Sequence, residues 1–455
     1  MKKTLIASLC AAMLAGMCLQ TAQAQAAKLQ LLYAFTNTDG VNPFAGLCAG
    51  QDGNFYGTTT SGGTNGDNGT VFKVTTNGLL TSLVSFADTN GSDSQAGLTQ
   101  GGDGNFYGTT VVGGTNGGWG TIFKVTTNGV LTSLVSFANT NGAFPYSGLT
   151  PGNDGNFYGT TYYGGSDSLG TVFNVTTNGV LTPLMSFANT NGANPKAGLA
   201  LGSDGNFYGT TTSGGTNGWG TIFKVTTNGV LTSLVSFNNT NGAFPRAALT
   251  PGNDGNFYGT TYYGGSNILG SSNSFGTIFR VTTNGVLTSL VSFNNTNGAY
   301  PIGELTLGSD GNFYGTTYSG GSSNLGTAFQ MTTNGMLTTL VSFNNTNGAN
   351  PYAGWTPGSD GNFYGTTASG GGSGTNGVVV KLLVPPMLGP VSISNHAPQI
   401  SIKGLARPSL QIQFTTNLTA SWSVLTNLVF TNGAGQFTDS AATNVPQRFY
   451  RAAVQ

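Results

Sequence analysis

The chain has 455 residues with no net charge at pH 7, and 6% of its residues are charged while 11% are aromatic. The aromatic content argues against an intrinsically disordered chain, and the lack of a basic excess argues against nucleic-acid binding, because Lys and Arg must neutralise phosphates. The length leaves room for a large repeat domain and a smaller unit.

Residues 1–24 have the pattern of a secretory signal peptide. Lys2 and Lys3 precede an apolar stretch from Leu5 to Leu19, and Ala22-Gln23-Ala24 is a typical cleavage site. No later segment is long and apolar enough to span a membrane. We therefore expect a secreted or otherwise extracytoplasmic protein, outside the cell, on its outer surface or in the periplasm.

One octapeptide, Asp-Gly-Asn-Phe-Tyr-Gly-Thr-Thr, organises the next 350 or so residues. It begins at Asp52 and recurs without change at Asp103, Asp154, Asp204, Asp254, Asp310 and Asp360. The steps between copies are 51, 51, 50, 50, 56 and 50 residues. A fixed period near 50 indicates a propeller, a solenoid or another array.

Each repeat contains four strand-like runs, which in the second repeat are expected at residues 97–99, 106–110, 121–125 and 130–137. The Asn-Gly pair at 128–129 indicates a hairpin, because these residues accept the positive φ angles of a type I′ turn. No segment shows a sustained helical period. Four short antiparallel strands in about 50 residues is the size of one propeller blade.

The positions of the fourth strands indicate how the ring closes. Seven copies of the first three strands are followed by only six internal fourth strands, and a seventh, Leu29–Phe35, stands before the first repeat. At the other end, Gly377–Leu382 is a third strand with no fourth strand after it. We therefore predict an all-β fold with a seven-bladed β-propeller at residues 25–384, closed by an N-terminal strand.

Beyond a proline-rich linker at residues 385–390, residues 391–455 predict a small β-sandwich of the Ig/fibronectin-like kind, with five or six strands. Trp422 is a candidate for its core. The single histidine of the chain, His396, also falls here, and one histidine is too few for a His metal cluster.

The positions of the acidic residues favour a role in stabilising turns over a role in catalysis or metal binding. Seven of the 14 stand in the Asp-Gly-Asn turns, where Asp accepts backbone N–H bonds and Gly takes a positive φ. A glycosidase needs two carboxylates within about 10 Å, and the other acids are scattered. Gly62–Asp67 is only weakly similar to a calcium-binding repeat. We predict no catalytic residue, no metal and no cofactor.

Cys48 and a set of five cations are also interpreted as residues without a chemical role. The counterparts of Cys48 in other repeats are Thr or Ala, which indicates a small strand residue and not a nucleophile. Five cations share one third-strand position and are interpreted as solvated edge charges: Lys73, Lys124, Lys224, Arg280 and Lys381.

Two loops vary between repeats, the one from second to third strand and the one from fourth to first strand. Because strand direction alternates, both emerge on the same face, and loops on a rigid scaffold are where binding residues concentrate. Aromatic rings among Asn, Ser and Gly suit sugar rings. The predicted ligand-binding residues are Trp119, Tyr162, Tyr163, Trp219, Tyr262, Tyr263 and Tyr318. The alternative is that these rings only cover the tops of the blades.

The fourth-to-first loops vary at two positions on either side of a residue that is usually proline. They carry, after it, Phe44, Tyr146, Lys196, Arg246, Ile302 and Tyr352 and, before it, Phe144, Phe244 and Tyr300.

The repeated octapeptide, with the Gly-Gly, Gly-Thr-hydrophobic-Phe and Leu-Thr-x-Leu-x-Ser-Phe segments that follow it, resembles the Gloeobacter/Verrucomicrobia tandem repeat over about Leu29 to Leu383. The resemblance implies an extracytoplasmic bacterial protein and supplies no catalytic residues. Residues 446–452 are similar to the end of small sandwich domains in verrucomicrobial secreted proteins. Relatives often end in a Pro-Glu-Pro sorting tail with a membrane helix, which does not occur here.

We therefore predict a secreted, monomeric, non-enzymatic repeat protein that binds a glycan or another surface polymer through the variable-loop face. One alternative is a structural or adhesive cell-surface protein whose sandwich domain docks to a cell-envelope component. Another is a polysaccharide lyase or hydrolase, which would need an acid pair or a Tyr/Arg base in the central channel.

Overall fold

The computed structural model describes residues 26–265, 274–372, 376–394, 397–417, 421–430, 434–442 and 448–454. The predicted leader at residues 1–24 and His396 lie outside the described residues. The chain divides into two compact units, a larger one of Lys28–Gly358 and Phe363–Leu382 and a smaller one that includes the residues from Leu383 onward. Among the described residues, no helix is long and apolar enough to cross a membrane.

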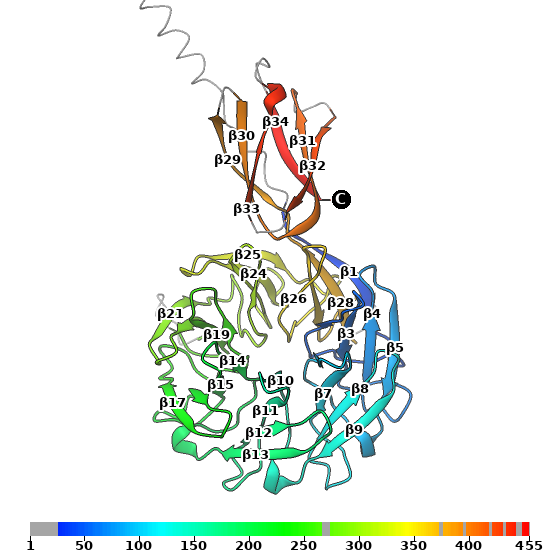
Figure 1. The fold of residues 1–455 in the computed structure, drawn as a ribbon, viewed down its shortest axis with the longest axis vertical. Helices are drawn as coiled ribbons and strands as arrows, with labels where there is room; N and C mark the ends of the chain where they lie inside the picture. The colour runs from blue at the N-terminus through cyan, green and yellow to red at the C-terminus, as the bar shows by residue number, and fades with distance from the viewer. Residues whose placement is uncertain are drawn as a thin grey trace, which may run out of the picture. The chain divides into compact units, whose positions relative to one another are not determined.

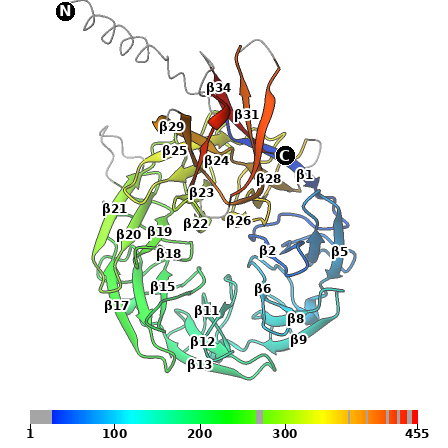
Figure 2. The ribbon, with the colours of Figure 1, turned by 45° about the horizontal axis from the view of Figure 1, so that its top comes forward.

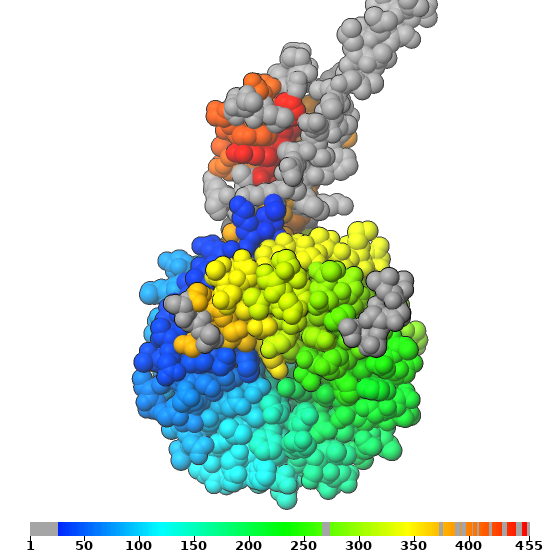
Figure 3. Space-filling model, turned by 180° about the vertical axis from the view of Figure 1, so that it is seen from behind, coloured from blue at the N-terminus to red at the C-terminus, as the bar shows by residue number. Residues whose placement is uncertain are grey.

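The larger unit is a ring of four-stranded sheets, seven of them in the described residues, which follow one another in chain order (Figures 1, 2 and 3). The order β1-β28-β27-β26 in one of them places the first described strand beside three strands from the end of the propeller. The prediction of an all-β propeller fold is confirmed.

The four strand positions have the following bounds. The first strands, two residues each, are β2 (Cys48–Ala49), β6 (Thr99–Gln100), β10 (Thr150–Pro151), β14 (Ala200–Leu201), β18 (Thr250–Pro251), β22 (Thr306–Leu307) and β26 (Thr356–Pro357). The second strands are β3 (Phe55–Thr58), β7 (Phe106–Thr110), β11 (Phe157–Thr161), β15 (Phe207–Thr211), β19 (Phe257–Thr261), β23 (Phe313–Thr317) and β27 (Phe363–Thr367).

The third strands are β4 (Thr70–Val74), β8 (Thr121–Val125), β12 (Thr171–Val175), β16 (Thr221–Val225), β20 (Thr277–Val281), β24 (Thr327–Met331) and β28 (Val378–Leu383). The outer strands are β5 (Leu80–Ser85), β9 (Leu131–Ser136), β13 (Leu181–Ser186), β17 (Leu231–Ser236), β21 (Leu287–Ser292), β25 (Leu337–Ser342) and β1 (Lys28–Ala34). Three fourth-to-first loops start with a 3-10 turn: η1 (Asp88–Asn90), η2 (Asn139–Asn141) and η3 (Asn189–Asn191).

The Phe-Tyr pair of each octapeptide joins neighbouring sheets. Successive side chains of a strand point to opposite faces, so Phe106 faces the preceding sheet and Tyr107 the following one. Tyr56 lies on Phe106 with ring centroids 4.0 Å apart, and Tyr107 lies on Phe157 at 4.5 Å. The same contact recurs in Tyr158–Phe207, Tyr208–Phe257, Tyr258–Phe313, Tyr314–Phe363 and Tyr364–Phe55. The last of these joins the seventh sheet to the first.

The glycine after the Phe-Tyr pair lets a third aromatic ring approach. A Cβ atom on Gly108 would lie 2.6 Å from the Phe123 ring of β8, closer than real contacts allow. That ring in turn meets Phe86 of the preceding sheet edge to face, with centroids 5.1 Å apart. All of these rings are buried, so the core of the propeller consists of layers between sheets.

The Asp-Gly-Asn turns are held by the aspartate, as predicted, and also by the buried tyrosine. Asn105 donates from its backbone and side-chain amides to the Asp103 carboxylate at 3.2 and 2.7 Å, and Gly104 has a φ of 78°. The Tyr107 hydroxyl donates to the same carboxylate at 2.8 Å. Burial opposes ionisation of Asp103, but the hydrogen bonds from Asn105 and Tyr107 lower its pKa on balance.

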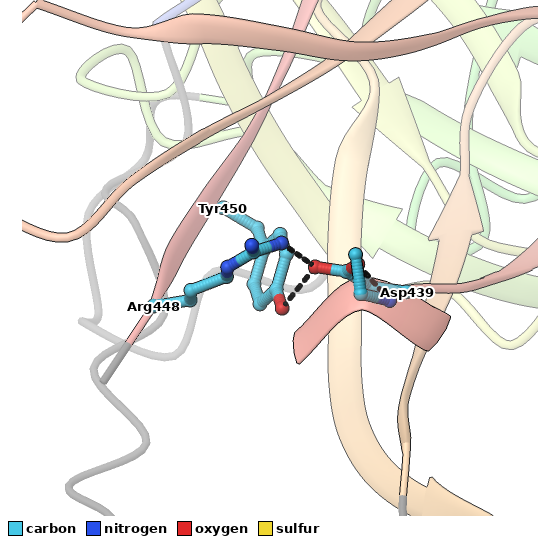
Figure 4. A network of polar contacts seen from close by, with 4 residues as sticks. Asp439, Arg448 and Tyr450 are labelled. Carbon is cyan, nitrogen blue, oxygen red and sulfur yellow. Dashed lines mark hydrogen bonds and ion pairs between the residues drawn. The ribbon is translucent and has the colours of Figure 1, made fainter. Parts of the chain in front are cut away.

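The described residues of the smaller unit form two three-stranded sheets. One has the order β29 (Met387–Ser394), β30 (Ala397–Lys403) and β33 (Ala434–Thr438), and the other has β32 (Ser423–Phe430), β31 (Arg407–Thr415) and β34 (Phe449–Val454). Buried Ile402, Leu410 and Ile412 form its core. A 3-10 turn, η4 (Ser440–Ala442), follows Asp439, whose carboxylate accepts hydrogen bonds from Arg448 and Tyr450 (Figure 4).

Two sequence expectations for this unit differ from the structure. Trp422 is not part of the core: Arg451 lies over its ring, with the guanidinium carbon 4.5 Å from the centroid. Strand β29 begins at Met387, inside the predicted linker at 385–390. The pairing register shifts between Leu388 and Val391, and such a bulge accommodates Pro390, which has no N–H for a ladder bond.

Replacing Tyr208 tests the contacts between sheets. Tyr208→Phe removes the hydrogen bond to Asp204 but keeps the ring, so we expect the free energy of unfolding to fall by about 1 kcal/mol. Tyr208→Ala also removes the contact with Phe257, and we expect a loss of about 3–5 kcal/mol in urea unfolding. Equal losses for both variants would mean that the ring contact does not stabilise the propeller.

Acid should weaken the propeller through the same turns. The pKa is lowered for Asp52, Asp103, Asp154, Asp204 and Asp254. A lowered folded-state pKa stabilises the fold above the ordinary value of about 4, and this contribution is lost as pH falls through the folded-state value. We expect the melting temperature to fall steeply below about pH 4. In Asp204→Asn this decrease should be smaller, and an equal decrease would contradict the assignment.

Candidate functional site

A cavity of about 260 Å³ lies among the first strands at the centre of the ring, and residues from all seven repeats line it. Seven lining residues occupy equivalent positions in the fourth-to-first loops: Phe44, Gln95, Tyr146, Lys196, Arg246, Ile302 and Tyr352. We call these seven residues the mouth.

The two variable loops of each repeat lie side by side, as the sequence predicts. Short antiparallel bridges connect them, for example Ala143 with Tyr163 and Ala243 with Tyr263. The loop residues next to the mouth therefore share a face with the predicted binding residues.

Three bulky residues in these loops have an unfavourable backbone conformation. Phe144, Phe244 and Tyr300 have φ angles of 55°, 53° and 57°. Four other repeats place Asn or Asp here, which tolerate positive φ, whereas an aromatic residue does so at a cost. Strain of this kind clusters at functional sites, so these rings are candidates for binding.

A first series of contacting rings extends to the mouth from the loop between the second and third strands of the second repeat. Its members are Trp119, Phe144, Tyr163, Tyr162 and Tyr146, with neighbouring centroids 5.4, 6.0, 4.7 and 5.3 Å apart. At the mouth the Lys196 amine lies 4.8 Å from the centroid of the Tyr146 ring. Rings that are up to 44 residues apart in sequence, from Trp119 to Tyr163, thus form one continuous series of contacts.

A second series repeats this arrangement two sheets further on. Its members are Trp219, Phe244, Tyr263 and Tyr262, with neighbouring centroids 5.2, 6.1 and 4.5 Å apart. The Arg246 guanidinium carbon lies 3.8 Å from the centroid of the Tyr262 ring. Tyr300 contacts both tyrosines, at 5.2 and 5.3 Å. Each series therefore ends at a cation of the mouth.

The seven predicted binding residues are not equally accessible. Tyr163 and Tyr263 are exposed, by 44% and 37%, whereas Trp119 and Trp219 are half-buried against the core between sheets. The two tryptophans thus also cover the tops of the blades, which was the alternative interpretation of these aromatic residues. Tyr318 belongs to neither series: it contacts Tyr352, which stacks on Phe44 at 4.6 Å.

Lys196 and Arg246 are the residues that sequence reasoning did not select. Both are half-buried, and within the described part of the chain neither forms an ion pair. The Nε atom of Arg246 is buried without a hydrogen-bond partner there. Burial, and then the positive charge of Arg246, lower the pKa of Lys196 to about 8, although Asp93 partly offsets this. The signal available in the sequence was two cations in successive repeats at one loop position.

Glu304 gives the cavity an unexpected acid. It stands where the other repeats have glycine or alanine: Gly46, Gly97, Gly148, Gly198, Ala248 and Gly354. Its carboxyl is enclosed by the channel wall but still reached by solvent, and this enclosure raises its pKa. Among the described residues that line the cavity, no second carboxylate lies beside it.

The arrangement favours binding over acid–base chemistry. Burial raises the pKa of Tyr146, Tyr162, Tyr262 and Tyr352, so these hydroxyls stay protonated as hydrogen-bond donors and make poor bases. Arg246 partly offsets the rise at Tyr262. A Tyr/Arg pair, which the sequence did not reveal, is therefore present at the mouth but electrostatically unsuited to proton abstraction.

Other candidates for chemistry lie away from this constellation. Burial raises the pKa of the Cys48 thiol in β2, which disfavours the reactive thiolate. Asp67, in the calcium-like segment, accepts a hydrogen bond from the Gly62 backbone. In the described ranges, no three or more His, Cys, Asp or Glu side chains form a group that could hold a metal.

The family model of the Gloeobacter/Verrucomicrobia repeat matches residues 16–153, 118–271 and 267–386. The chain belongs to this repeat family. A search of curated proteins finds no match.

Several solved structures resemble the fold of this family member. The extracellular domain of a protein described as a hybrid two component system from B. thetaiotaomicron matches with a TM-score of 0.52 and 10% identity, over 94% of this chain and 55% of that one. This chain thus spans about half the length of that protein. At such low identity the likeness shows the fold alone.

Two further structures that resemble this fold are described as enzymes. A protein described as a 6-phosphogluconolactonase from Bacteroides uniformis has a TM-score of 0.45 and 13% identity, over 87% of this chain and 99% of that one. An ulvan lyase has a TM-score of 0.43 and 10% identity, over 90% and 99%.

The environment of Lys196 can be measured by its reactivity. With a pKa near 8 in place of 10.5, its amine should react with an acylating reagent with a midpoint near pH 8 in mass-spectrometric profiles. Arg246→Gln removes a repelling charge and should raise that midpoint, whereas Asp93→Asn should lower it. A midpoint that neither substitution moves would contradict the proximity of these charges.

Proposed function

We propose that this member of the Gloeobacter/Verrucomicrobia repeat family is a secreted, monomeric, non-enzymatic protein that binds glycan through the face around the mouth. The observation that carries the proposal is the pair of matching aromatic series that end at Lys196 and Arg246. Sugar rings offer apolar C–H faces to such aromatic surfaces and hydroxyls to their tyrosine O–H groups.

Three properties of the described residues support binding at this face. The rings stand on loops held by a rigid propeller, and a preformed surface loses little conformational entropy when a ligand binds. The backbone is strained at Phe144, Phe244 and Tyr300, and strain of this kind clusters at functional sites. Two similar series on one ring let a polymer contact both at once, which strengthens binding by avidity. The predicted leader supports an extracytoplasmic location.

A polysaccharide lyase is the second candidate, because Arg246 lies directly over the Tyr262 ring. In such an enzyme the arginine would neutralise an acidic sugar and the tyrosine would remove a proton. The raised pKa of Tyr262 opposes this role, so we favour binding without turnover.

The test is a binding assay with the full chain lacking residues 1–24, against a panel of insoluble and soluble polysaccharides. We expect affinity for at least one polysaccharide, and a decrease of about tenfold or more when Tyr162, Tyr163, Tyr262 and Tyr263 are replaced by Ala, because each ring contributes about 0.5–1.5 kcal/mol beyond its burial. Pull-down and affinity electrophoresis measure it.

The matched control replaces four exposed valines in the hairpins between third and fourth strands: Val130, Val180, Val230 and Val286. Their Ala variants should bind like the parent. A parent chain without affinity for any polysaccharide of the panel would overturn the proposal and favour a structural or adhesive role. Release of unsaturated or reducing sugar ends by the parent would overturn the non-enzymatic part.

A further inference from the structure

We propose that the mouth selects acidic glycans, with Lys196 and Arg246 receiving a carboxylate or sulfate group while Tyr146 and Tyr262 contact the sugar rings on either side. This inference rests on the proposed glycan-binding function and adds the class of ligand. It combines a central cavity, two unpaired cations and two tyrosine rings, all from described residues.

The two cations are contributed by neighbouring repeats of the propeller. Lys196 and Arg246 occupy the same loop position in the fourth and fifth repeats, and both line the cavity. Each lies against a tyrosine ring, at 4.8 Å for Lys196 and 3.8 Å for Arg246. The charge of Arg246 is near enough to disfavour protonation of Lys196. An anionic group between them would contact both.

Neither cation is neutralised within the described part of the chain. Asp93, whose charge acts on Lys196, accepts hydrogen bonds from the Gln95 side chain at 3.0 and 3.1 Å. Two half-buried like charges without a partner are costly, and an anion removes that cost. The buried Nε of Arg246 also lacks an acceptor, and a guanidinium pairs with carboxylate or sulfate oxygens through parallel hydrogen bonds.

The surroundings favour an anionic sugar over a nucleic acid or a deeper-bound anion. Two cations among rings are too few to track a phosphate backbone, which needs a basic stripe. Tyr352 and Phe44, which stack on each other, extend the aromatic wall of the mouth. Glu304 also lines the cavity, and its carboxylate repels an anionic group whenever Glu304 is ionised. This repulsion favours the side of the cavity where Lys196 and Arg246 lie.

The experiment compares chemically matched polymers by affinity electrophoresis and calorimetry, using the full chain lacking residues 1–24. One pair is a polyuronate and its carboxyl-reduced neutral form, and another is a sulfated galactan and its desulfated form. We expect at least one acidic polymer to bind about tenfold or more tightly than its neutral partner, with an affinity that falls as salt rises. The pair that shows the difference identifies carboxylate or sulfate as the recognised group.

Substitutions test whether Lys196 and Arg246 cause the preference for the acidic polymer. Lys196→Gln and Arg246→Gln should each weaken binding of the acidic polymer by about tenfold and weaken binding of the neutral polymer less, because each removes one charge that only the acidic polymer pairs with. Arg246→Lys keeps the charge and should retain part of the affinity. Lys224→Gln, a charge change in β16 outside the mouth, is the matched control.

The outcomes separate the two proposals. Equal affinity for acidic and neutral partners, or Lys196 and Arg246 variants that bind like the parent, would overturn the acidic-glycan inference and leave glycan binding intact. No binding of any polymer by a folded parent chain would overturn both. Melting curves of the variants show whether a loss of binding reflects loss of the fold.

Discussion

The contact between each tyrosine and the phenylalanine of the next sheet is the interaction on which the propeller depends. Phe and Tyr are adjacent in sequence, so alternation along the strand sends one ring to each neighbouring sheet, and Tyr364 on Phe55 joins the two ends of the repeat series. The following glycine makes room for a further ring, and the tyrosine hydroxyl reaches the aspartate of the turn. One octapeptide thus supplies the core, the spacing and the hairpin of every blade.

Because this frame is the same in every repeat, the differences between repeats are concentrated in the loops of one face. The ring is nearly symmetric, but its mouth is not: two neighbouring repeats contribute Lys196 and Arg246, and the next contributes Glu304 in the wall. The aromatic series extend from the second to the third repeat and from the fourth to the fifth, and each ends beside one of these cations. A polar, charged centre flanked by exposed rings follows from substitutions at a few loop positions.

The electrostatics of this face favour recognition over turnover. Burial keeps Tyr146 and Tyr262 protonated, and among the described residues that line the cavity Glu304 is the one carboxylate. The two cations lack counter-ions in the described residues, so their charge is available to a ligand. The same features that make proton transfer unfavourable make hydrogen bonding and charge pairing with an acidic sugar favourable.

The sequence by itself determined the repeating frame, because its signals are local. The strands predicted at 106–110 and 121–125 match β7 and β8, and the role of Asp103 in its turn follows from residues two positions apart. Only the tertiary structure decided which side chains meet at the mouth, since Tyr146 and Lys196 are 50 residues apart and their contact depends on how two sheets pack. The same holds for Trp422, whose pattern suggested a core residue but which lies under Arg451. Contacts between side chains of different loops depend on how the loops and sheets pack, which no local pattern encodes.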